Sequence, residues 1–170
     1  MDTTIQALID RYQLKPLPVE GTLFAQTYRS TDDATPGRAV GTAMIGLYCA
    51  EPKSHSLFHR LTLDEIWHFY GGDPLRLVLL KSDGSSGDIL LGPDVSKGHH
   101  VQFCVPAGVW QAGEMLPGGR YSLYGCTLAP GWFPECFEGG TRSQLLASHP
   151  ERAADIERLA CPEGDISMPQ

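Results

Sequence analysis

Between residues 21 and 128 the chain consists of short β-prone segments, and this pattern constrains the fold more than any other feature of the sequence. The segments are rich in β-branched, aromatic and aliphatic residues, and clusters of Gly, Pro, Asp and Ser separate them. We predict strands at residues 22–29, 40–49, 66–70, 75–81, 89–91, 101–105, 109–112 and 121–128. About eight short strands at this spacing are typical of a β-sandwich or a jelly roll. The sequence therefore predicts an all-β fold.

Helical patterns flank this β region at both ends. Apolar residues from Ile5 to Tyr12 recur at steps of three and four, which predicts a short N-terminal amphipathic helix. Apolar residues recur at helical spacing again near the other end, so we expect a C-terminal helical appendage over about residues 141–160. A chain of 170 residues fits one domain. We therefore interpret residues 1–170 as a single domain whose barrel covers about residues 21–130.

Composition and charge limit the class of partner. The net charge of −7 and the pI of about 5.2 indicate no basic surface for nucleic acid or anionic lipid. No apolar run approaches the ~20 residues that cross a bilayer, and the first residues lack the pattern of a secretory signal. The five cysteines form no C-x-x-C pair, which favours reduced, mostly buried thiols. We expect a cytoplasmic protein that binds a small molecule, with neither nucleic acid nor a membrane as a partner.

Two segments, residues 59–72 and residues 106–111, contain most of the side chains suited to chemistry. His59 is a candidate general base, because an imidazole titrates near neutral pH and can remove a proton next to a carbonyl. A histidine that is merely hydrogen-bonded at a barrel rim is the alternative. Glu65 is suited to orient His59, to bind a substrate hydroxyl or to ligate a metal weakly. The alternative is that Glu65 forms a structural ion pair with Arg60 or Arg76.

The first segment resembles the first motif of the cupin superfamily, G-x5-H-x-H-x3,4-E-x6-G, in which two His and one Glu bind a metal ion. His59, Glu65 and Gly72 stand at motif positions, but Leu61 stands where the second His belongs. The sequence therefore lacks one metal ligand of the family pattern.

The second segment resembles the second cupin motif, G-x5-P-x-G-x2-H-x3-N. Pro106 and Gly108 match it, whereas Gln111 replaces the His ligand. Catalytic zinc or iron usually takes three firm protein ligands, and an amide binds metal weakly. We therefore expect no cofactor, and a divalent metal on His59, Glu65 and Gln111 is the alternative.

Further segments in the same order resemble the cupin-5 family of small cupins, for which no reaction is settled. Among them are EG at residues 20–21, TYRS at 27–30, DEIWHFY at 64–70 and GCTLAPG at 125–131. The resemblance spans about residues 5–137. It implies a double-stranded β-helix, the cupin jelly roll, and a homodimer. It also implies a relationship in fold to sugar-nucleotide epimerases and isomerases, but fold alone does not imply their reaction.

Other candidate site residues are aromatic, amide or titratable. Trp67 and Trp110 are candidates to stack on a flat ligand such as a sugar ring, with packing in the core as an equal alternative. Gln111 is a candidate ligand-binding residue, because its amide both donates and accepts hydrogen bonds. His68 follows Glu65 by three residues, so it faces outward in a regular strand, and only a bulge would turn it toward the pocket.

Tyrosine phenols are the candidates for an acid that complements His59 in an epimerase. Tyr121 and Tyr124 differ by an odd step, so they lie on opposite faces of a regular strand. We keep Tyr121 as the candidate acid and Tyr48 as a candidate ligand-binding residue. Packing in the barrel wall is the alternative role for each of them.

The sequence supports two classes of function. In the first, the protein is a metal-independent isomerase, epimerase or lyase that acts on a polar, carbohydrate-like molecule by proton transfer, with His59 as base and Glu65 as its partner. In the second, the same pocket binds a small molecule without turnover. A metal-dependent oxygenase or isomerase is the third, less favoured hypothesis.

Overall fold

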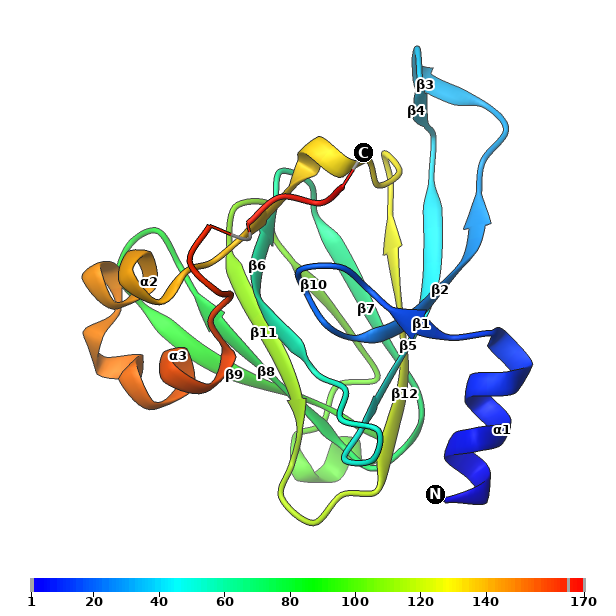
Figure 1. Cartoon of the computed structure of the whole chain (residues 1–170), viewed down its shortest axis with the longest axis horizontal. Coiled ribbons are helices and arrows are strands. Elements are labelled where there is room, and N and C mark those ends of the chain that lie inside the picture. The colour runs from blue at the N-terminus through cyan, green and yellow to red at the C-terminus, as the bar shows by residue number, and fades with distance from the viewer. Residues whose placement is uncertain (1, 165, 170) are drawn as a thin grey trace.

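Two antiparallel sheets form the body of the protein (Figure 1). The computed structural model describes residues 2–164 and 166–169. The six-stranded sheet has the order β1 (Lys15–Pro16), β2 (Leu23–Arg29), β5 (Thr42–Cys49), β12 (Tyr121–Leu128), β7 (Glu65–Gly72) and β10 (Gln102–Val105). The five-stranded sheet has the order β13 (Phe137–Gly139), β6 (Ser56–Leu61), β11 (Trp110–Met115), β8 (Leu75–Leu80) and β9 (Ser86–Leu91). Successive strands alternate between the sheets from β5 to β8 and again from β9 to β12, as in a jelly roll. The all-β prediction is confirmed.

Short helices and one hairpin complete the structure. The helices are α1 (Thr3–Tyr12), α2 (Arg142–Ser148) and α3 (Ala153–Leu159), with single 3-10 turns η1 (Val95–Lys97), η2 (Pro134–Cys136) and η3 (Pro150–Arg152). Both helical predictions from the apolar spacing are therefore confirmed. The hairpin β3 (Asp33–Thr35) and β4 (Arg38–Ala39) projects beyond the end of the sheets (Figure 1). None of the helices that the structure describes combines the length and the apolar character needed to span a membrane.

Hydrophobic clusters hold the layers together. Between the sheets, Trp67 and Tyr124 pack with leucines of β8. Helix α1 covers part of the outer face of the six-stranded sheet, where Ile5 packs in a cluster with Leu47. Helices α2 and α3 cover the outer face of the five-stranded sheet, where Ile156 and its neighbours pack against β6, β8 and β11. Burial of these apolar faces, at about 25 cal/mol per Å², provides the main stabilisation of the arrangement.

All eight predicted strands are present, but β6, which carries His59, was not predicted. In this strand Phe58 packs under the C-terminal helices, while Ser56 and His59 both turn toward the space between the sheets. A step of two residues in β11, from Gln111 to Gly113, pairs with a step of three in β6, from His59 to Ser56, which marks a bulge. The bulge and the burial of both faces remove the alternation of apolar and polar residues on which strand prediction depends.

Candidate active site

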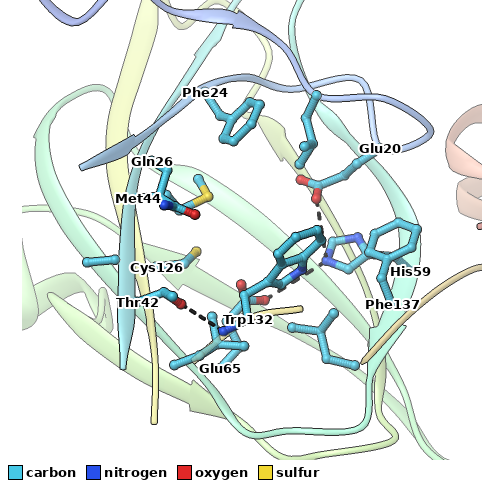
Figure 2. Close-up of a pocket in the computed structure, with 14 residues that line it drawn as sticks. Glu20, Phe24, Gln26, Thr42, Met44, His59, Glu65, Cys126, Trp132 and Phe137 are labelled. Carbon is cyan, nitrogen blue, oxygen red and sulfur yellow. Dashed lines mark hydrogen bonds and ion pairs between the residues drawn. The ribbon is translucent and has the colours of Figure 1, made fainter. Parts of the chain in front are cut away.

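A cavity of about 310 Å³ lies between strands of the two sheets (Figure 2). Its lining includes three titratable side chains, Glu20, His59 and Glu65, which point toward one another in Figure 2. Aromatic and aliphatic side chains form most of the remaining wall. The aromatic ones are Phe24, Trp132 and Phe137. The cavity is therefore an apolar pocket with one concentrated polar group, which is the usual composition of a small-molecule site.

His59 is held so that a single ring nitrogen faces the carboxylates. Its Nδ1 lies 2.9 Å from the carbonyl oxygen of Leu57, and because a carbonyl only accepts, Nδ1 carries the proton and donates. Phe137 stacks on the ring with the centroids 5.3 Å apart. These two contacts orient Nε2, which lies 3.9 Å from Oε2 of Glu20 and 4.0 Å from Oε2 of Glu65.

The spacing of these three atoms leaves a position for one ligand atom. The separations of 3.9 and 4.0 Å exceed the length of a hydrogen bond. An oxygen atom placed about 2.8 Å from Nε2 and from a carboxylate oxygen satisfies both, at an angle of about 90° between them. A substrate hydroxyl, which accepts from Nε2–H and donates to a carboxylate, therefore fits between these groups, whereas a carbonyl oxygen accepts from Nε2–H alone.

Glu65 is fixed by a chain of hydrogen bonds that crosses between the sheets. The indole Nε1–H of Trp67 donates to Oε1 of Gln111 at 2.9 Å, and Nε2 of Gln111 donates to Oε2 of Glu65 at 2.6 Å. Because an indole nitrogen can only donate, Trp67 determines which end of the Gln111 amide faces Glu65. Gln111 is 1% exposed and lies behind Glu65, so its role is to position that carboxylate.

Glu20 is fixed by a second chain of hydrogen bonds. The Tyr48 phenol donates to Oγ of Ser56 at 2.5 Å, and Ser56 donates to Oε1 of Glu20 at 2.6 Å. Burial raises the pKa of the Tyr48 phenol well above its ordinary value, so the phenol stays protonated and remains a donor. Tyr48 therefore supports Glu20 from behind and does not reach the cavity.

The backbone that presents Glu20 is held in an uncommon conformation. Val19 has a φ of 63° and Gly21 has a φ of 91°, so both neighbours of Glu20 are left-handed. This region is costly for a β-branched residue such as Val19. The N–H of Gly21 donates to the carbonyl of Leu17 at 2.9 Å, which closes the turn. The surrounding structure thus holds Glu20 against His59 at a cost in local backbone energy.

The two carboxylates decide the charge of His59. Burial by itself would lower the pKa of His59, but the charge of Glu20 and the interaction with Glu65 outweigh burial and raise the pKa to about 9. His59 is therefore protonated at neutral pH. Burial also raises the pKa of Glu20, even though the charge of His59 acts in the opposite direction. An acid and a base with shifted proton affinities thus face the same position in the cavity.

The residues present do not fit the three-ligand metal site of the cupin pattern. Leu61 lines the cavity where a second histidine would stand. The oxygen of the Gln111 amide accepts from Trp67, so Gln111 presents hydrogen atoms toward Glu65, and these cannot ligate a cation. Over residues 2–164 and 166–169, no group of three or more His, Cys, Asp or Glu side chains is arranged to hold a metal ion.

Three residues predicted for the site lie elsewhere. Tyr121 packs beside Leu123 in the cluster under α1, on the face opposite Tyr124, as its odd spacing predicted. Trp110 packs under the C-terminal helices, and the guanidinium of Arg60 lies 4.5 Å above its ring. The outward orientation expected of His68 in a regular strand is found.

His68 lies on the outer face of the six-stranded sheet, where its Nε2 is 3.0 Å from Oγ1 of Thr127. Its ring stacks on that of Tyr70, which is 54% exposed. Of the eight predicted site residues, the structure therefore brings His59 and Glu65 to the cavity wall. It places Gln111, Trp67 and Tyr48 in the two hydrogen-bond chains behind the carboxylates.

Sequence reasoning assigned no role to Glu20, Phe24 or Trp132. Glu20 belongs to one of the segments that resemble the cupin-5 family, and this was the available signal. Trp132 follows the predicted barrel, and its N–H donates to Oγ1 of Thr42 at 2.9 Å. Cys126 also lines the cavity, but burial raises the pKa of its thiol well above the ordinary value, which makes it a poor nucleophile.

Comparison with known proteins identifies one matching family model and similar solved structures. Residues 6–139 match the family model described as Cupin_5, Cupin superfamily (DUF985). A crystal structure of a protein from Shewanella oneidensis is 32% identical, with a TM-score of 0.86 over 96% of this chain and 100% of that chain. A hypothetical protein from Leishmania major is 30% identical, with a TM-score of 0.81 over 92% of this chain and 98% of that chain. A comparison with curated proteins found no match.

Proposed function

The chain belongs to the Cupin_5 family of the cupin superfamily (DUF985), and we propose that it is a metal-independent isomerase or epimerase that moves a proton on a polar, carbohydrate-like substrate. The observation that carries the proposal is the position of His59 Nε2, 3.9 Å from Glu20 and 4.0 Å from Glu65 at the cavity wall. This arrangement pairs a protonated imidazole with carboxylates around a site for one substrate oxygen.

In the proposed reaction His59 acts as the acid and Glu20 as the base. This reverses the role of base that the sequence suggested for His59, because its pKa of about 9 leaves it protonated at neutral pH. Burial raises the pKa of Glu20, which strengthens it as a base, whereas Glu65 is committed to the hydrogen bond from Gln111. Glu65 is therefore assigned to hold the charge and position of His59.

The proton transfers balance without a further reagent. Glu20 removes a proton from the carbon next to a carbonyl, and the electron pair of that C–H bond forms the double bond of an enol. The His59 imidazolium gives its Nε2 proton to the carbonyl oxygen at the same time. Glu20 then returns the proton to the former carbonyl carbon. The hydroxyl on the carbon that lost the proton gives its own proton to His59, which forms the new carbonyl and yields the isomer.

The wall of the cavity supports a ring-shaped or short polyol substrate. Phe24, Trp132 and Phe137 offer aromatic faces against which the C–H surface of a sugar packs. The hydroxyl groups of such a substrate would reach Glu20 and Glu65, which are each about a tenth exposed.

The test follows proton transfer and needs no advance knowledge of the product. The protein is incubated in D2O with single aldoses, ketoses and their phosphate esters, and NMR follows the loss of C–H signals. We expect deuterium incorporation into at least one compound with the wild type, and a loss of at least about 100-fold in His59→Gln and Glu20→Gln. His68→Gln is the matched control, because His68 lies outside the cavity.

A binding protein without turnover is the second candidate, and the largely apolar wall is the observation that favours it. A binding protein should bind one of the tested compounds saturably and should incorporate deuterium into none of the tested compounds. Incorporation that persists unchanged in His59→Gln would instead refute the assignment of His59 as acid.

We also propose that the protein is a homodimer in a reducing compartment such as the cytoplasm. Cys49, Cys104, Cys126 and Cys136 are free thiols, and reduced thiols are the rule in the cytoplasm. Tyr28 in β2 and Tyr70 in β7 are 56% and 54% exposed, and each is a candidate for contact with a second copy. Light scattering after size-exclusion chromatography measures the mass directly, and a monomeric mass of 18.5 kDa would exclude the dimer.

A further inference from the structure

A second cavity adjoins the first on the side of the β3–β4 hairpin. Its volume is about 620 Å³, and Gln26 and Trp132 line both cavities. Arg29 at the end of β2 and Arg38 in β4 also line it. We call it the mouth cavity, and Trp132 lies between it and the cavity that contains His59.

Arg29 is oriented by neutral partners. Its Nη1 donates to the carbonyl oxygen of Trp132 at 3.1 Å, and its Nη2 donates to the carbonyl oxygen of Gly37 at 3.3 Å. These contacts use two of the five donors of the guanidinium, and neither partner is a carboxylate. The same contact with Trp132 ties the position of Arg29 to the aromatic wall of the inner cavity.

Arg38 is also oriented without a carboxylate. Its guanidinium carbon lies 3.8 Å from the centre of the Phe133 ring, in a cation–π contact. Gly131, next to the inner cavity wall, donates its N–H to the carbonyl oxygen of Ala39 at 2.8 Å, which holds β4 against this loop. Phe133 thus supports the flat face of the guanidinium and leaves its edge donors available.

Among the described residues, Arg11, Arg29 and Arg38 are the arginines without an ion pair, and of these Arg29 and Arg38 line the mouth cavity. Among the described residues, the ion pairs of arginine involve Arg60, Arg76, Arg120, Arg142, Arg152 and Arg158. Arg29 and Arg38 take part in none of the ion pairs found there. Glu135 is the acidic residue in the wall of the mouth cavity, and it lies within no ion-pair distance of either arginine. The wall of the mouth cavity therefore contains two cations and one carboxylate with no ion pair between them, in a chain with a net charge of −7.

We propose that Arg29 and Arg38 bind an oxyanion, a phosphate ester or a carboxylate, that belongs to the same small molecule whose neutral end reaches His59. This rests on the proposed function for the neutral end. Glu20 and Glu65 repel an anion from the inner cavity, whereas two guanidinium forks match the geometry of an oxyanion at the mouth. The substrate is therefore oriented with its charge at the mouth and its reacting carbon between Glu20 and His59.

The experiment is calorimetric titration of the full chain with phenyl phosphate and, separately, with benzoate. The variants are Arg29→Gln/Arg38→Gln and His59→Gln, and Arg11→Gln is the matched control because Arg11 is exposed in α1 and far from the hairpin (Figure 1). We expect the double variant to bind phenyl phosphate at least about tenfold more weakly than the wild type. Arg11→Gln should stay within about twofold of the wild type, and His59→Gln should weaken binding by less than the double variant does.

The two compounds identify the anion, because a phosphate site prefers phenyl phosphate and a carboxylate site prefers benzoate. Wild-type binding that shows no preference for either and no loss in the double variant overturns the proposal, as does the absence of any binding to the wild type. Loss of binding in His59→Gln with full binding in the double variant also overturns it. If the anion binds as expected but no sugar exchanges deuterium, the proposed reaction fails and the anion site stands.

Discussion

The amide nitrogen of Gln111 donates a 2.6 Å hydrogen bond to Oε2 of Glu65, so the residue at the position of a cupin metal ligand instead holds a carboxylate. Trp67 fixes the orientation of that amide from behind. The carboxylate is thereby kept 4.0 Å from Nε2 of His59, where it helps to keep the imidazole protonated. The loss of a metal ligand and the charge of His59 are thus connected through one side chain.

Replacement of Gln111 by Leu should destabilise the protein by about 2 kcal/mol, because it leaves the buried Trp67 N–H and a carboxylate oxygen of Glu65 without their partner. Urea denaturation followed by circular dichroism measures this free energy of unfolding. Gln102→Leu is the control, since Gln102 is exposed and its loss should cost under about 0.5 kcal/mol. Equal effects of the two substitutions would show that the Gln111 bridge contributes nothing.

The ionisation of His59 should make stability fall with rising pH. A raised pKa stabilises the folded state fully below the unfolded value of 6.5, and this contribution is lost as the pH rises through the folded value of about 9. We therefore expect the free energy of unfolding to decrease between about pH 6.5 and pH 9 in the wild type, and this decrease to be smaller in His59→Gln. NMR of the histidine ring signals measures the pKa directly, and a value at or below 6.5 would contradict the assignment of His59 as an acid.

Removal of the Glu20 carboxylate should lower the pKa of His59. In Glu20→Gln the charge that most strongly raises the pKa of His59 is lost while burial, which lowers it, remains. The pKa of His59 should therefore fall, and the same ring signals should titrate at lower pH than in the wild type. Glu163→Gln is a suitable control, because Glu163 is exposed near the C-terminus and does not face the cavity. An unchanged titration of His59 in Glu20→Gln would mean that the two groups are not coupled.

Gly21→Ala should show whether the turn at Gly21 positions Glu20 in addition to stabilising the fold. The φ of 91° at Gly21 costs an L-residue about 1–2 kcal/mol, and the position adjoins Glu20. Gly84→Ala in the hairpin between β8 and β9 has nearly the same φ, 83°, in open space. We expect a similar loss of stability in both variants by urea denaturation, but a lowered pKa of His59 only in Gly21→Ala. Identical His59 titration in the two variants would show that the turn does not position Glu20.

Gly46 makes room for a core aromatic ring. A Cβ atom at this position in β5 would overlap the ring of Tyr124, which is fully buried and stacks on Trp67. Gly46→Ala should therefore cost about 1–3 kcal/mol through overpacking. Gly71→Ala in β7 meets no atom within 4 Å and should change the midpoint of urea unfolding little. Equal midpoints for the two variants would contradict the close approach of Tyr124.

The positions of most strands along the chain could be predicted from the sequence because their faces differ in polarity. The segment Tyr121 to Leu128 alternates between the core and the outer face, and its predicted bounds are those of β12. His68 and Glu65 were placed on opposite faces by the same rule. In β6 the rule failed, because helices cover one face, the cavity lies on the other and a bulge shifts the phase.

The sequence by itself determined the all-β jelly roll, its flanking helices, the departure from the metal-ligand pattern, and His59 with Glu65 as residues of one pocket. These follow from periodicity and from motif spacing, which are local properties of the chain. Only the tertiary structure decided that Glu20 completes the site, that Gln111 turns its amide toward Glu65, and that Trp110 and Tyr121 lie outside. Such contacts join strands and turns far apart in sequence, and the charge of His59 depends on their combined distances and burial, which no local pattern encodes.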